Sequence, residues 1–115
     1  MNNPLFNALN EFGEKVNTHP RMASLLKDWD RTIQISSVDS DEAFTVKILN
    51  AKVVDIAKGN QAETNITLRG TEEILVDVFN GILSPAFEFL EGRIDVDADD
   101  KDQVKLDALA LVLWD

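Results

Sequence analysis

The stretch GTEEILVDVFNGILSPAFEFLEGRIDVDADDKDQVKLDALALVLWD, residues 70–115, decides most of what the sequence predicts about the fold. A polar turn opens two short apolar helices, a strand follows within GRIDVDAD, and a last helix ends the stretch. From Ala108 to Trp114 all seven residues are apolar, although a surface helix needs only one apolar stripe. We therefore expect the last helix to be covered on more than one face by core, a bound apolar ligand or a partner chain.

Particular residues within this stretch predict where its helices begin and which side chains they bury. Thr71 is expected to cap the first helix, and Gly81 to end it. Ser84 and Pro85 predict the start of the second helix, and Asp102 is expected to cap the last one. The apolar stripe of the first helix is predicted to contain Ile74, Leu75, Val78, Phe79 and Ile82.

Upstream of this stretch, the chain begins with a helical pattern. Asn3 and Pro4 are typical of a helix start, with Asn as the cap and Pro in the first turn. Leu5, Leu9, Phe12 and Val16 follow at helical spacing. His19-Pro20 breaks the pattern, and a short second helix is expected to carry Met22, Leu25 and Leu26.

The middle of the chain alternates apolar and polar residues, which predicts four amphipathic strands. Asp39-Ser40-Asp41 is expected to form a turn, and Asn50-Ala51 a tight hairpin loop. One face of these strands should be apolar and the other polar and solvated. The predicted apolar positions are Ile33, Ile35, Phe44, Val46, Ile48, Val54, Ile56, Ile66 and Leu68. With Ile94, Val96 and Ala98 on a fifth strand, the sequence predicts an α+β fold in one domain, 1–115: one sheet with a polar face, and helices over the other face.

The charge of the chain is strongly negative and unevenly distributed. The formal net charge is −10, of which −9 falls in residues 72–115. A chain this acidic repels phosphate backbones and anionic membrane surfaces, so we expect no nucleic-acid partner and no stable membrane insertion. Because the start of the sequence lacks the pattern of a signal peptide and no run is long enough to span a membrane, we expect a cytoplasmic protein.

Catalytic and metal sites are not predicted. The chain has no cysteine and only one histidine, His19, which lies at a helix break without a sequence context for a nucleophile. The acidic run 95–100 resembles the start of a calcium loop, but Asp100 and Leu106 stand where that loop needs Gly and Glu. We therefore expect a non-enzymatic protein that has no cofactor and no metal site.

The order of the segments resembles the sterol carrier protein-2 family of lipid-binding domains. The resemblance is carried by the strand NITLRG (65–70), the helical segment TEEILVDVFNGILSPAFEFLEG (71–92), the strand RIDVDAD (93–99) and the KLDAL of the last helix (105–109). It covers nearly the whole chain and depends on element order rather than on one invariant motif. It implies three strands, a crossover to a fourth strand, helices, a fifth strand and a closing helix, which makes a five-stranded mixed sheet.

The resemblance further implies an apolar tunnel between the sheet and the C-terminal helices, for a fatty acyl chain, a sterol-like or an isoprenoid ligand. The carrier would bind this hydrophobic ligand without catalysis, and its expected pocket residues are apolar. The candidate ligand-binding residues are Phe79, Ile82, Leu83, Phe87, Phe89, Leu90, Leu106, Leu109, Leu113 and Trp114.

An alternative interpretation covers the apolar last helix with protein. The chain would then be an interaction or scaffold module, with Ala108–Trp114 buried in an interface with a partner or with a second copy of the chain. Such a module could be an accessory to lipid or quinone metabolism. The acidic C-terminal part argues against polyanionic ligands such as acyl-CoA, unless Arg69, Arg93, Lys101 or Lys105 converge on the mouth of the pocket.

Overall fold

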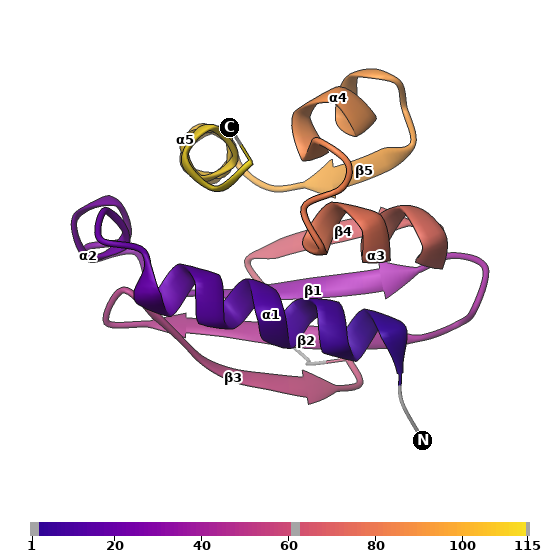
Figure 1. The fold of residues 1–115 in the computed structure, drawn as a ribbon, viewed down its shortest axis with the longest axis horizontal. Helices are drawn as coiled ribbons and strands as arrows, with labels where there is room; N and C mark the ends of the chain where they lie inside the picture. The colour runs from indigo at the N-terminus through magenta and orange to yellow at the C-terminus, as the bar shows by residue number, and fades with distance from the viewer. Residues whose placement is uncertain (1–2, 61–62, 115) are drawn as a thin grey trace.

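Five strands form one mixed sheet, and five helices accompany it in the computed structural model, which describes residues 3–60 and 63–114 (Figure 1). The expected α+β class and the five-stranded mixed sheet are confirmed. The helices are α1 (Pro4–Thr18), α2 (Met22–Leu25), α3 (Glu72–Phe79), α4 (Pro85–Leu90) and α5 (Asp100–Leu113). The strands are β1 (Arg31–Ser37), β2 (Ala43–Leu49), β3 (Lys52–Lys58), β4 (Ile66–Gly70) and β5 (Ile94–Asp97).

The strand order is β3-β2-β1-β4-β5, with one parallel pair. β4 runs parallel to β1, and the other neighbours are antiparallel. The first three strands are therefore a meander, and the chain then crosses from the β3 edge to the other side of β1, as expected. The connection ends where the Asn65 side chain accepts a hydrogen bond from the Thr32 backbone N–H (2.8 Å).

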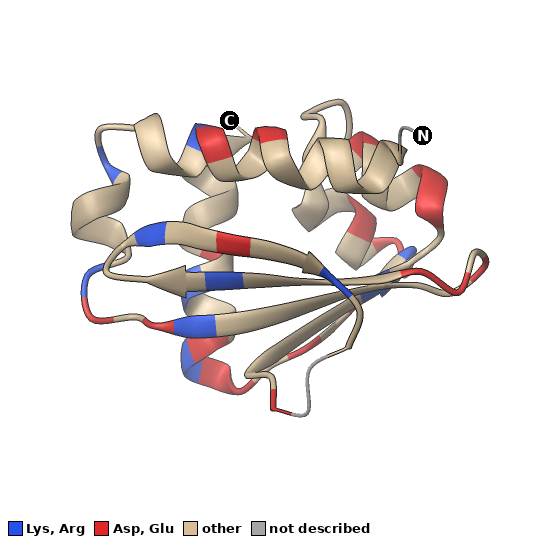
Figure 2. Cartoon of the chain, turned by 90° about the horizontal axis from the view of Figure 1, so that it is seen from below, with Lys and Arg blue, Asp and Glu red and all other residues tan. Residues whose placement is uncertain are grey.

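The two faces of the sheet differ in polarity because the strands alternate in register. On one face Ile33 pairs with Val46 and Ile66, and all three are buried. On the other face Lys47 pairs with Asp55, and Arg69 with Asp95. The helices pack on the apolar face, as Figure 2 shows for α1. The sequence alternation thus decides which face receives the helices.

The polar face is covered locally rather than solvated throughout. The Thr45 hydroxyl donates to the Gly59 carbonyl (2.9 Å), and Gln34 donates to the Asn60 side chain. Both acceptors belong to the crossover that follows β3. Thr45 is consequently buried, which the expectation of a solvated polar face missed.

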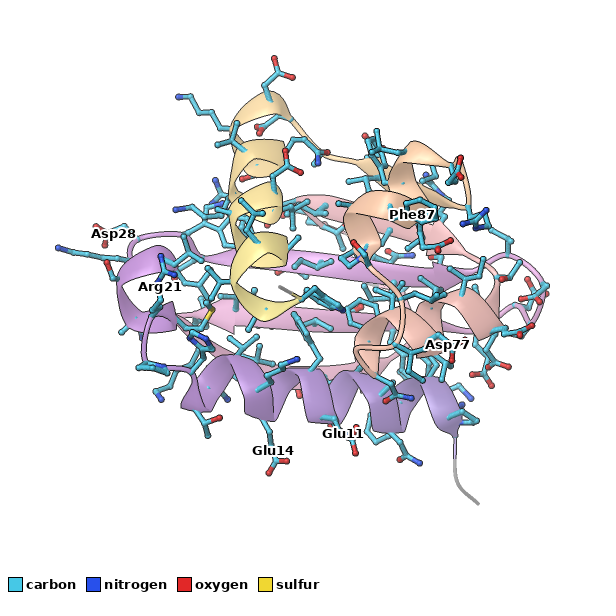
Figure 3. The ribbon with its side chains drawn as sticks, turned by 45° about the horizontal axis from the view of Figure 1, so that its top comes forward. Glu11, Glu14, Arg21, Asp28, Asp77 and Phe87 are labelled. Atoms are coloured by element: carbon cyan, nitrogen blue, oxygen red, sulfur yellow. The ribbon has the colours of Figure 1, made fainter. Side chains whose placement is uncertain are left out.

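Helix α1 forms as predicted. The Asn3 side chain accepts hydrogen bonds from the N–H groups of Leu5 and Phe6, both at 3.1 Å, so it satisfies donors that the helix leaves unpaired. The predicted stripe of Leu5, Leu9, Phe12 and Val16 is buried. Glu11 and Glu14 point away from the sheet on the outer face of the helix (Figure 3).

Val54 and Ile56 of β3 were predicted to lie on the apolar face of the sheet, and this prediction was wrong for Val54, which is 52% exposed. The register between β2 and β3 shifts after Lys47, so Ile48 pairs with Val53 while Lys47 pairs with Asp55. This irregularity leaves Val54 without a partner on β2, and turns Val53 toward α1 instead. A β-bulge of this kind cannot be read from alternation alone.

One expectation for α5 was also wrong, namely which residue caps it. Asp99 caps the helix by accepting from the Asp102 N–H (3.0 Å), and Asp102 lies in the first turn with its side chain buried. Leu111 is 71% exposed and Val104, two turns earlier, is 69% exposed, so cover of this further face by a ligand or a partner chain stays a prediction. Its covered side carries Leu109 and Leu113.

The β2–β3 hairpin loop provides a test of the backbone. Asn50 and Ala51 have positive φ values of 53° and 64°, as a tight turn requires. Glycine tolerates this region and alanine does not, so Ala51→Gly should raise the unfolding free energy by about 0.5–1 kcal/mol in urea titrations. Ala57→Gly in the extended part of β3 is the matched control and should be destabilising; a loss of stability in both variants would contradict the argument.

Candidate ligand-binding cavity

An apolar cavity of about 360 Å³ lies between the sheet and the helices α1, α3, α4 and α5. Its floor is the apolar face of the sheet, and its roof and walls are helical. The lining side chains are Phe12, Val16, Leu26, Ile33, Ile35, Val46, Ile48, Leu68, Leu75, Val78, Phe79, Pro85, Ala86, Phe89, Leu90, Ile94, Val96, Gln103, Leu106, Asp107, Leu109, Ala110 and Trp114. The volume falls in the range of about 300–1,000 Å³ that small-molecule pockets occupy.

The polar part of this lining is confined to α5. Gln103 and Asp107 lie one helical turn apart, and the Gln103 Nε2 donates to Asp107 Oδ1 at 3.1 Å. Trp114 also lines the cavity, but its indole N–H donates to the Val78 carbonyl at 2.6 Å. Among the described lining residues there is no Lys or Arg. The interior can therefore accept an apolar chain, with hydrogen bonding at one place only.

The mouth of the cavity lies between α4 and α5. The exposed members of the lining are Ala86, Phe89 and Leu90 on α4 and Asp107 on α5, whereas the sheet and α1 contribute buried or half-buried side chains. Figure 3 shows α4 and α5 side by side on the helical face of the sheet. A ligand can therefore enter past the Asp107 side of α5 and the apolar rim of α4.

The N-terminal end of α5 is held by a buried carboxylate. Asp102 Oδ1 accepts from Trp29 Nε1 and from Arg31 Nε, both at 2.8 Å, and the Asp102 side chain is 5% exposed. One turn later, Lys105 Nζ donates to the Leu25 carbonyl at 2.7 Å. The residue pattern that suggested a helix cap at Asp102 thus marks a tertiary contact to β1 and the segment before it.

The C-terminal end of the same helix is held by aromatic packing. The Trp114 ring stacks on Phe12 of α1 with centroids 5.7 Å apart, and it meets Phe79 of α3 edge-on at 6.4 Å. The ammonium group of Lys15 lies 5.9 Å from the Trp114 ring centroid. Because α5 is held at both ends, its middle turns, with Leu106 and Ala110, form one wall of the cavity.

Helix α4 is held by an ion pair within its own segment. Glu88 is buried and accepts two hydrogen bonds from Arg93, one of them from Nη2 to Oε1 at 3.1 Å. The hydrogen bonds from the Arg93 guanidinium lower the pKa of Glu88 from its usual 4.5, although desolvation acts in the opposite direction. The same guanidinium lies 5.7 Å from the Phe87 ring centroid. The α4 side of the mouth is thereby tied to the start of β5.

The structure brings six of the ten predicted ligand-binding residues to the cavity and leaves four away from it. Ile82 is 69% exposed, and Leu83 and Phe87 also lie outside the lining. Leu113 is buried in the core. Ligand contact by any of the ten stays a prediction. The residues that line the cavity are Phe79, Phe89, Leu90, Leu106, Leu109 and Trp114.

Sequence reasoning missed the floor of the cavity and both polar residues of its wall. Alternation predicts that Ile33, Ile35 and Val46 lie on the apolar face of the sheet, but it does not show whether that face is filled. Gln103 and Asp107 lie on a helix rich in acidic residues, and no local sequence pattern indicates that they border a cavity. Their spacing of four residues predicts only that they lie on the same side of the helix.

No metal site or membrane-spanning helix occurs in the described ranges. Residues 3–60 and 63–114 contain no group of three His, Cys, Asp or Glu side chains placed to hold a metal ion. Within the same ranges no helix is both long and apolar enough to cross a membrane.

The fold is that of sterol carrier protein 2 domains. Sterol carrier protein 2 from Aedes aegypti in complex with palmitate matches with a TM-score of 0.69 and 12% identity, over 98% of this chain and 99% of that one. The apo form from Yarrowia lipolytica matches with a TM-score of 0.63 and 16% identity, over 95% of this chain and 86% of that one. No protein-family model matches the sequence, and no curated protein does.

The same fold also occurs as part of a larger enzyme. The stereoselective inverting sec-alkylsulfatase Pisa1 from Pseudomonas sp. matches with a TM-score of 0.60 and 17% identity, over 79% of this chain. The match spans 14% of the length of the sulfatase. An SCP2-like domain therefore occurs both alone and joined to a catalytic protein.

The contact of Asp102 can be tested by its removal. Asp102→Ala leaves the buried Trp29 N–H without an acceptor and Arg31 without its carboxylate, so the unfolding free energy should fall by about 3 kcal/mol. Urea unfolding measures this change. Asp100→Ala in the same first turn is the control, because Asp100 is exposed, and should cost less than about 1 kcal/mol. Equal losses in the two variants would rule out a special role for Asp102.

The Glu88–Arg93 pair predicts an acid-sensitive α4. Because the folded pKa of Glu88 is lowered, its stabilisation is complete above the usual value and is lost as the pH falls through the folded pKa. The protection factors of the α4 amides, which are the intrinsic exchange rates divided by the observed ones, should fall as the pH is lowered from about pH 6 to pH 3, and Glu88→Gln should flatten that dependence. Glu91→Gln, at an exposed position of the same turn, should leave it intact. A pH profile unchanged by Glu88→Gln would contradict this assignment.

Proposed function

We propose that the protein is a non-enzymatic, cytoplasmic carrier that holds the apolar chain of a lipid-like ligand in its cavity. The observation that carries the proposal is an apolar space of about 360 Å³ that opens to solvent between α4 and α5. The family resemblance implies a tunnel, and we propose that the cavity continues as a tunnel around a bound chain.

The driving force would be the removal of apolar ligand surface from water, about 25 cal/mol per Å² before the costs of association. The floor residues, such as Ile33 and Ile35, lie on a sheet and are rigidly placed. The rim residues Phe89 and Leu90 lie on the short helix α4, whose local contacts include the Glu88–Arg93 pair. We expect the sheet to position the chain and α4 to adjust as the chain enters.

The structural relatives support a lipid-like ligand in this fold. One of them is a sterol carrier protein 2 in complex with palmitate, and it matches nearly the whole chain. The sulfatase match shows that the fold also occurs as a small part of a larger enzyme. Carriage to an enzyme is therefore as compatible with the proposal as carriage between membranes.

A second candidate function comes from the exposed side of α5. Val104 and Leu111 are seven residues apart, so they lie on one side of the helix, and each is about two thirds exposed or more. Such a surface is typical of an interaction site, which keeps the interaction module and the homodimer as a second proposal. Light scattering of the native chain and of Leu111→Glu tests it: a dimer that the substitution dissociates would support this function.

The carrier proposal predicts that filling the cavity blocks uptake. Ala110 lines the cavity, so Ala110→Phe should occupy ligand space and weaken binding at least about tenfold, while the fold is retained. Ala108→Phe makes the same change on the same helix outside the lining and is the matched control. Mass spectrometry of the organic extract and displacement of a fluorescent fatty acid measure binding, and circular dichroism verifies folding.

Trp114 supplies a second readout within the native chain. Its ring lines the cavity, whereas Trp29 is occupied with Asp102, so ligand uptake should change tryptophan emission through Trp114. Trp114→Phe should abolish the emission change. A folded native protein that retains no lipid and takes up no lipid analogue would overturn the carrier function.

A further inference from the structure

We infer that the ligand carries a neutral hydroxyl head group rather than an anionic one, and that Gln103 and Asp107 recognise it. This inference rests on the proposed function and adds the chemical class of the ligand. The observation behind it is that the polar groups of the cavity wall are a carboxylate and an amide, placed on one side of α5 beside an otherwise apolar space.

The pair lies where a head group would be. Asp107 is exposed and Gln103 half-buried, although both line the cavity, so they mark its boundary with solvent. A chain inserted toward Ile33 and Ile35 leaves its polar end at this boundary, because burial of an unpaired polar group is unfavourable. At this position the pair can discriminate between head groups, whereas most of the affinity would come from the apolar chain.

The hydrogen-bonding inventory of the pair matches a hydroxyl. Gln103 Nε2 carries two hydrogens, and one of them is donated to Asp107 Oδ1. The second hydrogen can be donated to a ligand oxygen, while Asp107 retains acceptor capacity for a ligand O–H. An alcohol offers one acceptor oxygen and one donor hydrogen at a single atom, and so can satisfy both groups at once.

The basic side chains around the cavity are engaged elsewhere. Arg31 pairs with Asp102, and Arg93 with Glu88. Lys105 donates to the Leu25 carbonyl, and the Lys15 ammonium group lies over the Trp114 ring. The described lining thus presents no cation to a carboxylate, sulfate or phosphate head group.

The negative charge of the C-terminal part also disfavours an anionic head group. Residues 72–115 carry a formal charge of −9, and Figure 2 shows several acidic positions near the start of α5. An anionic head group beside Asp107 would meet a like charge at the mouth of the cavity, which lowers the affinity for such a head group. The sequence analysis named four basic residues that could converge on the mouth of the cavity. Arg69 and Arg93 form ion pairs, and Lys105 donates to a backbone carbonyl. The fourth, Lys101, does not line the cavity.

Three probes that share one alkyl chain separate the head group from the chain. Binding of hexadecanol, palmitate and hexadecylamine to the delipidated native protein is measured by displacement of a fluorescent lipid probe. The measurement is made at about pH 8, so that the carboxylate of free palmitate is ionised. Because the alkyl chain is constant, differences in affinity report the head group. We expect hexadecanol to bind about tenfold more tightly than palmitate.

The variant Asp107→Asn assigns that preference to the site. It keeps the shape of the side chain and removes its charge, so palmitate should gain affinity and the preference for hexadecanol should fall several-fold. Asp97→Asn removes the same charge from the exposed, polar side of β5 and is the matched control, with an expected preference equal to that of the native chain. Gln103→Leu should weaken hexadecanol and leave the overall fold unchanged.

The outcomes distinguish the inference from the function on which it rests. If none of the three probes binds, the carrier function fails. If palmitate binds as tightly as hexadecanol, the carrier function stands and the head-group assignment is overturned. A preference for hexadecylamine would make Asp107 a counter-ion and overturn the hydroxyl. An equal response of Asp107→Asn and Asp97→Asn would place the preference in the net charge of the chain and not in this site.

Discussion

The arrangement of the C-terminal part depends on the buried carboxylate of Asp102, which accepts hydrogen bonds from Trp29 and Arg31. These two donors come from the segment that enters the sheet, so one side chain fixes where α5 begins relative to β1. A carboxylate that is 5% exposed is stable only when its lone pairs are satisfied, and both donors are therefore needed. With Trp114 packed on Phe12 at the other end, the path of the helix is determined.

The cavity lies beside the middle of this helix. Besides the contacts at both ends, the middle turns pack Leu109 into the core and border the cavity with Leu106, Leu109 and Ala110. The lining of an apolar space of about 360 Å³ makes van der Waals contacts across that space only with a molecule that fills it. A bound apolar chain would restore those contacts, which links the stability of this region to the proposed carriage of a ligand.

Charge and apolarity are separated in this molecule with little overlap. The acidic groups of β5 lie on the outer side of the sheet, and the glutamates of α1 point outward (Figure 3). Asp107 is the acidic residue that borders the cavity, together with its partner Gln103. The acidic C-terminal part is thus compatible with the proposed binding of an apolar molecule, and the proposed preference among head groups depends on this one pair of side chains.

The sequence by itself determined the α+β class, the helix start at Asn3, the hairpin at Asn50 and Ala51 and the apolar face of the sheet, because these follow from local periodicity and turn chemistry. Only the tertiary structure decided the exposure of Val54, which results from a register shift between two strands. The same holds for the burial of Asp102, whose donors are more than seventy residues away in the chain. Alternation and spacing specify which side of an element is apolar, but the distance between elements, and hence whether that side is filled or borders a cavity, is set by contacts between residues far apart in sequence.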